Sequence, residues 1–438
     1  MYIIYLSIFF FLQTLSLRVG HEPSGHAEEP STSHVERSTA DFPFLQDATT
    51  RQYLQSSQSR TMLIMRGLPG SGKSTLVDEI LKKYPFSVVC SSDAYFMKDG
   101  EYRFNKSELS ANHQMCQAKA DDACRRGERI IIIDNTNIRR WEFKAYVDLA
   151  RKFGYTYILV SPRTSWRNNA AELAKRNRHQ VDLQTIQKKL RSYEEYVPFY
   201  YGWFLNPTAS DSLMELSKKC MLECVRKNAQ LRLNMFGDTN EYPDPQILEY
   251  FSMDKGNSGK ILHCTAKFLG SPKNPAVRRK EYHESPEVQS SIGKAFAIEL
   301  TGMVISSEVV GMRVKLLPEA LKLYDKPEEK ENDKAHLQKK YVDEQVSIMD
   351  DTEIPEFHDL PASGRSAHLT IATANGVPPK RTNEVLLDAC DIEHALDMAG
   401  KTLPGVRIDQ GSIRQLKDQF WTVTFDKSII VTTLFGGY

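Results

Sequence analysis

A glycine-rich segment restricts the fold of the first half of the chain more than any other stretch. It reads Gly67-Leu68-Pro69-Gly70-Ser71-Gly72-Lys73-Ser74, follows the apolar run 62–66 directly and precedes a helical pattern at 75–83. The segment matches G-x-x-x-x-G-K-[ST], in which glycines let successive backbone N–H groups turn inward around an anion. Such a loop joins a buried parallel strand to a helix N-terminus. A chance glycine-rich turn would lack these flanks, so the sequence predicts an α/β P-loop domain with a parallel sheet.

This loop is expected to hold the phosphates of ATP or GTP together with Mg²⁺. Lys73 would reach the β- and γ-phosphates, and the Ser74 hydroxyl would ligate the metal. Further strands are expected at 87–92, 129–134 and 155–160, and carboxylates follow or end two of them. Asp134 would hold Mg²⁺ or its waters, whereas Asp93 would either accept a proton from a substrate hydroxyl or cap a helix. The nucleotide-binding candidates are Gly67, Gly70, Ser71, Gly72, Lys73, Ser74, Thr75, Asp93 and Asp134, with Ser74 and Asp134 as the metal candidates.

A basic stretch follows the last of these strands. Residues 163–191 hold eight Lys and Arg against two acids. Arg167, Arg176 and Arg178 would clamp phosphates as a lid. A solvated helix face is the equally weighted alternative for each of them.

The second half of the chain contains two H-x-T patterns, each inside an apolar run. His263-Cys264-Thr265 lies within 261–268, and His368-Leu369-Thr370 lies within 367–372. In a strand, residues i and i+2 share a face, so each His points the same way as its Thr. Two such strands side by side would surround one small anion with two imidazoles and two hydroxyls.

This arrangement suits the opening of a cyclic phosphate without a metal. One His would take a proton from water and the other would donate one to the leaving oxygen, and the Thr hydroxyls would bind the phosphate oxygens. For either His taken alone, a structural role is the alternative. The presence of two H-x-T patterns in apolar runs of the same half of the chain disfavours that alternative. The sequence does not assign which His is the base.

Seven segments, in this order, make the chain from about Phe42 onward similar to one known family. They are FPFLQD at 42–47, RGLPGSGKST at 66–75, SSDAY at 91–95, DNTN at 134–137, YYGWFL at 200–205, HCTAKF at 263–268 and AHLT at 367–370. With these motifs the chain resembles the vertebrate and fish 2′,3′-cyclic-nucleotide 3′-phosphodiesterase family of two-histidine phosphoesterases.

The resemblance implies an α/β P-loop kinase-like domain followed by an α+β bilobal phosphoesterase domain. It implies His263, Thr265, His368 and Thr370 as the catalytic set, with Phe268 and Tyr200 stacking on the nucleobase. The implied reaction is hydrolysis of nucleoside 2′,3′-cyclic phosphates, or of RNA 2′,3′-cyclic phosphate ends, to 2′-phosphates without a cofactor.

Three features depart from the family pattern. The family often has Arg two residues before the second catalytic His, whereas here Ser366 stands there and Arg365 precedes it; a one-residue shift in a strand changes the face. Residues 325–359 carry twelve acids and five Lys and are expected to form an acidic loop insert. The family's prenylatable C-terminal cysteine is replaced by Phe435-Gly436-Gly437-Tyr438. Either the sequence is truncated, or membrane attachment is lost or falls to the N-terminus.

The whole chain of 438 residues is almost neutral, with 57 Lys and Arg against 56 Asp and Glu, and its mean hydropathy is −0.45. These values exclude a polytopic membrane protein and a protein that coats nucleic acid along its whole length. Seven cysteines without a C-x-x-C pair favour a reducing, cytoplasmic compartment. The apolar segment 1–17 leaves a signal, an anchor or an alternative start open.

The expected organisation is an N-terminal apolar segment and disordered tether (1–54), a P-loop domain (55–195) and a phosphodiesterase domain (196–438). Two rival functions remain open at this stage. One is RNA end healing, in which the P-loop domain phosphorylates a 5′-hydroxyl with Asp93 as base. The other is a scaffold that binds RNA and associates with membranes or the cytoskeleton.

Overall fold

The computed structural model describes residues 41–99, 101–237, 244–251, 253, 261–270, 276–326, 364–398, 403–417 and 420–438. The N-terminal apolar segment, most of the tether and residues 327–359 of the acidic insert lie outside these ranges. Among the residues described, no helix has the length and apolarity needed to cross a membrane.

The first half contains the expected parallel sheet, with strand order β2-β5-β1-β6. Its strands are β1 (Thr61–Met65), β2 (Val88–Cys90), β5 (Ile130–Ile133) and β6 (Thr156–Val160). The helices of this half are α1 (Pro43–Gln46), α2 (Ala48–Gln55), α3 (Lys73–Lys83), α4 (Leu109–Arg125), α5 (Arg140–Lys152), α6 (Ala170–Arg176) and α7 (Leu183–Arg191). Short elements after β2 are the 3-10 turns η1 (Asp93–Phe96) and η2 (Lys106–Glu108) and the hairpin β3 (Met97–Lys98) and β4 (Glu101–Tyr102).

Alternating residues of the sheet pack into two different clusters, which is why these strands are apolar throughout. Leu63 and Ile132 pack with Leu76 of α3, whereas Ile64 and Ile131 pack with residues of α4 and α5. Because helices cover both faces, neither face carries the polar alternation of a half-exposed strand.

The second half is built on an antiparallel sheet of order β12-β13-β14-β7-β8-β11-β10-β9, and β14 also pairs with β9. Its strands are β7 (Tyr200–Phe204), β8 (His263–Phe268), β9 (Ala295–Ser306), β10 (Val309–Leu316), β11 (His368–Thr373), β12 (Gly405–Ile408), β13 (Gly411–Lys417) and β14 (Phe420–Gly437). Its helices are α8 (Pro207–Lys227), α9 (Ala229–Phe236), α10 (Asp244–Tyr250), α11 (Ala276–Glu284), α12 (Pro286–Ser291), α13 (Pro318–Leu321) and α16 (Arg381–Met398). The predicted combination of a parallel α/β part and an α+β part is thus confirmed.

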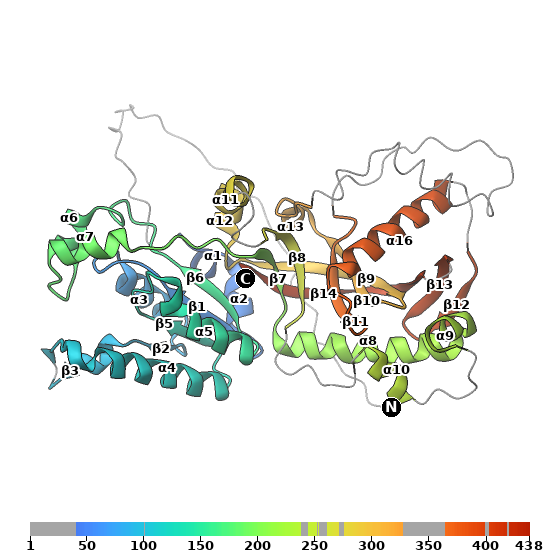
Figure 1. Cartoon of the computed structure of the whole chain (residues 1–438), viewed down its shortest axis with the longest axis horizontal. Coiled ribbons are helices and arrows are strands. Elements are labelled where there is room, and N and C mark those ends of the chain that lie inside the picture. The colour runs from blue at the N-terminus through green and yellow to red at the C-terminus, as the bar shows by residue number, and fades with distance from the viewer. Residues whose placement is uncertain are drawn as a thin grey trace, which may run out of the picture. The chain divides into compact units, whose positions relative to one another are not determined.

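Helices lie on two sides of this second sheet. One face packs Cys264, Leu369 and Met312 against residues of α8. The other face packs Val304 and Val309 against α16, and Figure 1 shows α8 and α16 on opposite sides of the strands. Because Cys264 and Leu369 are the central residues of the two H-x-T patterns, their flanking His and Thr residues face away from α8.

Two candidate phosphate sites

The P-loop connects β1 to α3, as its motif predicts. Gly70 and Gly72 have φ angles of +79° and +100°, in the left-handed region that glycine adopts without strain. Gly72 is also the N-cap of α3, whose first residues are Lys73, Ser74 and Thr75. The free N–H groups and positive dipole of this helix end therefore face the loop.

Lys73 is held near two carboxylates. Its Nζ donates to the carbonyl of Leu68 at 3.0 Å. Burial lowers the pKa of Lys73 to about 8, against the opposing effect of Asp134 and, more weakly, Asp93. Burial in turn raises the pKa of Asp134, against the lowering effect of Lys73. The structure thus brings together the cation and the two carboxylates that the sequence proposed for one nucleotide site.

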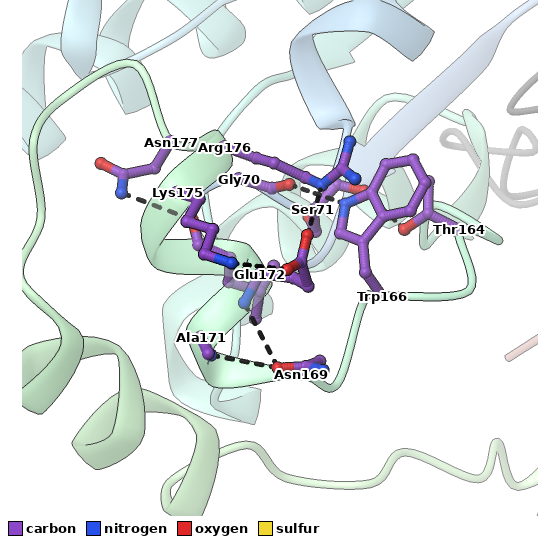
Figure 2. A network of polar contacts seen from close by, with 11 residues as sticks. Gly70, Ser71, Thr164, Trp166, Asn169, Ala171, Glu172, Lys175, Arg176 and Asn177 are labelled. Atoms are coloured by element: carbon purple, nitrogen blue, oxygen red, sulfur yellow. Dashed lines mark hydrogen bonds and ion pairs between the residues drawn. The ribbon is translucent and has the colours of Figure 1, made fainter.

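The loop between β6 and α6 forms hydrogen bonds to the P-loop, as Figure 2 shows. Trp166 Nε1 donates to the carbonyl of Gly70 at 3.1 Å, and Thr164 Oγ1 donates to the carbonyl of Ser71 at 3.1 Å. A Cβ atom on Gly70 would lie 2.3 Å from the carbonyl oxygen of Leu173. Gly70 is therefore required both for its φ angle and for the close approach of α6.

The three arginines of the expected lid differ in their surroundings. Arg176 pairs with Glu172 at 3.2 Å, and its guanidinium stacks over Trp166 at 4.1 Å (Figure 2). Its guanidinium is therefore held by contacts with residues of the same segment. Arg167 and Arg178 are exposed.

Asp93 has a setting that its sequence position did not reveal. It is the first residue of η1, whose N-cap is Ser92, so the structure does not show Asp93 as the cap of that turn. His179 Nε2, from the loop after α6, lies 3.6 Å from its Oδ2. Tyr102 of the hairpin packs against His179, with ring centroids 4.2 Å apart and the rings tilted by 42°. Burial and the Asp93 carboxylate raise the pKa of Tyr102 to about 12.

The two H-x-T strands are neighbours in the antiparallel sheet, with Leu369 directly opposite Cys264. The adjacent positions of an antiparallel pair then set His368 beside Thr265 and Thr370 beside His263. All four side chains share the face away from α8. The sheet therefore brings together the set that the sequence placed in two separate strands.

The His368 imidazole is oriented by the backbone just before it. Its Nδ1 lies 2.7 Å from the carbonyl oxygen of Ser366, which can only accept, so Nδ1 carries the hydrogen and Nε2 keeps its lone pair. Burial, followed by the positive charge of Lys326, lowers the pKa of His368 to about 3. The Ser366 carbonyl opposes that shift, whereas His263 adds to it. His368 is consequently neutral at physiological pH.

His263 is enclosed by aromatic rings of β7. Its ring stacks against Tyr200 at 5.0 Å and against Phe204 at 5.2 Å. Burial raises the pKa of Tyr200 to about 12.

A register shift in β8 determines where Phe268 points. Simple alternation from His263 would turn Phe268 toward the α8 face. However, Gly202 pairs with Thr265 and Tyr200 pairs with Phe268, so β8 has one extra residue between these pairs. Such a bulge returns Phe268 to the face of Tyr200 and His263, where its side chain is 67% exposed.

Neither Arg365 nor Ser366, the two residues before the second H-x-T pattern that depart from the family, places a positive charge against His368. Arg365 forms an ion pair of 2.7 Å with Asp391 of α16, and both side chains are buried. Ser366 is buried and bonds Tyr324 through the two hydroxyls at 2.8 Å. These contacts agree with the expected change of face for Arg365.

Lys326, at the start of the expected acidic insert, is the cation with the largest effect on the pKa of His368. The Asp325 amide donates to the Ala266 carbonyl of β8 at 3.1 Å, and the Lys326 ammonium donates to Asn383 Oδ1 of α16 at 2.7 Å. Residues 324–326 are therefore anchored to the strands of the site. No local motif marks Lys326.

A cavity of about 470 Å³ borders the P-loop at Gly67, Leu68 and Ser71. Its lining includes neither Lys73 nor the two H-x-T strands. Within the described ranges there is no cluster of three or more His, Cys, Asp or Glu side chains suited to a metal ion. All seven cysteines lie in the described part of the chain, and none of them forms a disulfide.

The fold and the two sites define a P-loop domain followed by an antiparallel phosphoesterase-like domain. Comparison with family models agrees: residues 62–196 match an AAA domain, and residues 197–438 match 2′,3′-cyclic nucleotide 3′-phosphodiesterase. The chain therefore belongs to the 2′,3′-cyclic nucleotide 3′-phosphodiesterase family, as its motifs predicted.

Individual relatives show how far the similarity extends. The 2′,3′-cyclic-nucleotide 3′-phosphodiesterase of Mus musculus is 29% identical over 417 residues, which cover 93% of this chain and 89% of the mouse protein. NEDD4-binding protein 2 of Homo sapiens is 39% identical over 136 residues, 31% of this chain and 8% of that protein. A solved Pnkp1/Rnl/Hen1 complex matches 27% of this chain and 39% of its own, with 23% identity and a TM-score of 0.23.

Proposed function

We propose that this protein hydrolyses nucleoside 2′,3′-cyclic phosphates to 2′-phosphates at the paired H-x-T strands. The observation that carries the proposal is the Leu369–Cys264 pairing, which puts two His and two Thr side chains on one face. RNA ends that carry a 2′,3′-cyclic phosphate present the same group and are included as substrates.

In this reaction His368 acts as the base and His263 as the acid. His368 Nε2 takes a proton from water, whose oxygen attacks phosphorus; the P–O3′ bond breaks and His263 protonates the departing 3′-oxygen. The assignment rests on the neutral state of His368 and on the Ser366 carbonyl that leaves Nε2 unprotonated. Thr265 and Thr370 donate hydroxyl hydrogens to the non-bridging oxygens.

The nucleobase is proposed to stack on Phe268, whose ring is exposed on the same face. Tyr200 lies directly opposite Phe268 and also packs against His263, so it joins the base-binding surface to the catalytic imidazole. An exposed aromatic ring binds bases of any identity, which predicts weak discrimination among the four nucleotides.

Product analysis tests this proposal. We expect only the 2′-phosphate from 2′,3′-cyclic AMP or NADP, and a 3′-phosphate product would contradict it. Since two imidazoles supply both proton transfers, the proposed hydrolysis needs no metal. A chelator should leave the rate of hydrolysis unchanged. A loss of rate that grows with the chelator concentration and is restored by Mg²⁺ would contradict hydrolysis without a metal.

For the P-loop we propose ATP or GTP binding with Mg²⁺. The Ser74 hydroxyl at the start of α3 and the Asp134 carboxylate after β5 are oxygen donors of the kind Mg²⁺ takes alongside phosphates. The metal would neutralise charge on the β- and γ-phosphates. Calorimetry should detect ATP binding that Mg²⁺ strengthens, and a Lys73→Met variant should lose it.

A second candidate function is phosphorylation of a 5′-hydroxyl on RNA. The observation that favours it is the position of Asp93, close enough to Lys73 to affect its pKa and flanked by His179. Incubation of the protein with 5′-hydroxyl RNA and γ-labelled ATP tests it. Absence of label transfer would leave the P-loop as a binding or regulatory domain.

The scaffold hypothesis with membrane or cytoskeletal partners is tested separately. A variant with both His263 and His368 replaced by alanine would still sediment with tubulin, membranes or RNA if binding were the main role. No specific contact in the described residues favours this alternative over hydrolysis.

A further inference from the structure

Apolar side chains are exposed around the hairpin β3–β4, which follows Asp93 and the turn η1 along the chain. Phe104 is 58% exposed, Met97 50% and Met115 49%, although large apolar side chains are usually covered. Phe104 packs against the ring of buried Phe96, with ring centroids 5.1 Å apart and the rings tilted by 48°. The Phe104 ring is therefore held by this contact while its side chain remains open to solvent.

This surface leads directly to the carboxylate near the P-loop. Phe96 also contacts Tyr102, Tyr102 packs against His179, and His179 Nε2 lies 3.6 Å from Asp93 Oδ2. Asp93 in turn lies close enough to Lys73 to act on its charge. A ligand that stacks on the Phe104 ring would therefore place a hydroxyl near Asp93. Asp93 lies near Lys73, the residue that would contact the terminal phosphate of a nucleotide bound at the P-loop.

The chemistry of the surface selects the ligand. Exposed aromatic rings bind nucleobases by stacking, and nearby cations bind phosphates of the backbone. Exposed Lys106 follows Phe104 on η2, and exposed Arg178 precedes His179 in the lid loop. A single strand offers unstacked bases to such a surface, whereas a duplex does not.

We propose that the hairpin and the lid loop form an acceptor site for the 5′-hydroxyl end of a single-stranded polynucleotide. Phe104 stacks on a base near that end, and the Tyr102–His179 pair positions Asp93. The proposal deepens the second candidate function, since it identifies where the kinase reaction would hold its acceptor.

The transfer step follows from this placement. The 5′-oxygen attacks the γ-phosphorus of ATP, and the bond from that phosphorus to the β–γ bridging oxygen breaks. Asp93 takes the hydroxyl proton, and ADP leaves with the bonding electron pair. His179 acts only through Asp93 and is a positioning residue.

Binding is tested first, without ATP. The probe is a fluorescent 5′-hydroxyl, 3′-hydroxyl oligoadenylate of about eight nucleotides, which has no cyclic phosphate. The background is the full chain with His263→Ala and His368→Ala, so that the phosphoesterase site does not contribute. Phe104→Ala should weaken binding about tenfold, whereas Phe104→Tyr should retain it.

Trp141 provides a matched control, because it is 68% exposed on α5 of the same half of the chain. Trp141→Ala should leave binding unchanged. Equal affinities for Phe104→Ala and the parent would overturn the acceptor site. So would equally large losses for Phe104→Ala and Trp141→Ala.

Label transfer from γ-labelled ATP then tests the positioning role. His179→Ala should lower kcat about tenfold with little change in KM for the oligonucleotide, and His179→Gln should recover part of it. A changed KM with unchanged kcat would overturn positioning. If the parent transfers no label yet binds through Phe104, the kinase proposal and the role of His179 fail, while the binding site stands.

Discussion

The P-loop and the H-x-T site both suit a phosphate group, but they are built in opposite ways. The P-loop is one continuous segment that relies on backbone N–H groups, a helix end and glycines such as Gly70, where a Cβ would collide with α6. The H-x-T site uses side chains from two strands that are far apart in sequence and become neighbours only through sheet pairing. We therefore expect phosphate binding at the P-loop to depend on the free space around its backbone. Activity at the H-x-T site should depend instead on individual side chains.

Loss of either imidazole proposed to be catalytic should have the largest effect. His263→Ala or His368→Ala removes one of the two proton transfers, so hydrolysis of 2′,3′-cyclic NADP should fall about 10²–10⁴-fold while ATP affinity stays the same. Product formation and calorimetry on the same preparation measure both. His113→Gln on α4 is a control that should retain both functions, and full activity in either alanine variant would refute the assignment.

The second largest effect distinguishes a residue that stabilises the fold around the H-x-T site from residues that contact the substrate. Arg365→Met leaves the Asp391 carboxylate buried without its ion-pair partner, so the free energy of unfolding should fall by about 3–5 kcal/mol. Activity per folded molecule should change little. Denaturant titration measures the stability loss, and the double change Arg365→Met with Asp391→Leu should recover most of it. A raised KM at unchanged stability would instead indicate contact with substrate.

The two sites also differ in how much of them could be predicted from sequence. The P-loop followed from local pattern, since its strand, loop and helix are consecutive. The pairing of the H-x-T strands was a sound expectation from two matching motifs. The face of Phe268 could not follow from alternation, because the extra residue in β8 reverses it. Lys326 and His179 were missed because they reach their sites through chain turns that no spacing rule encodes.

Lys326 provides a smaller, electrostatic test of the H-x-T site. Lys326→Met should lower kcat/KM about tenfold by removing a positive charge near the cyclic phosphate. It should also raise the pKa of His368 from about 3, because the cation that disfavours protonation is gone. The acid-side decline of kcat/KM would then move to higher pH, since the base works only when neutral.

A pH profile of kcat/KM between about pH 2 and 7, which includes the pKa of about 3, measures this shift. Lys322 is an exposed lysine just after α13 and serves as the control, since Lys322→Met should leave the profile unchanged. Identical profiles for both variants and the parent would show that Lys326 does not act on His368.

The smallest effect concerns the P-loop and follows from the lowered pKa of Lys73. With a pKa of about 8, the ammonium is fully charged near pH 6 and loses its proton as the pH rises through 8. ATP affinity should therefore be constant near pH 7 and decline toward pH 9.5, by at most about tenfold per pH unit above the pKa, because bound phosphates favour the charged form. Calorimetric titrations across this range measure it. A Lys73→Arg variant keeps its charge and should show no such decline, whereas a flat profile for the parent would mean that backbone groups alone determine phosphate affinity at this site.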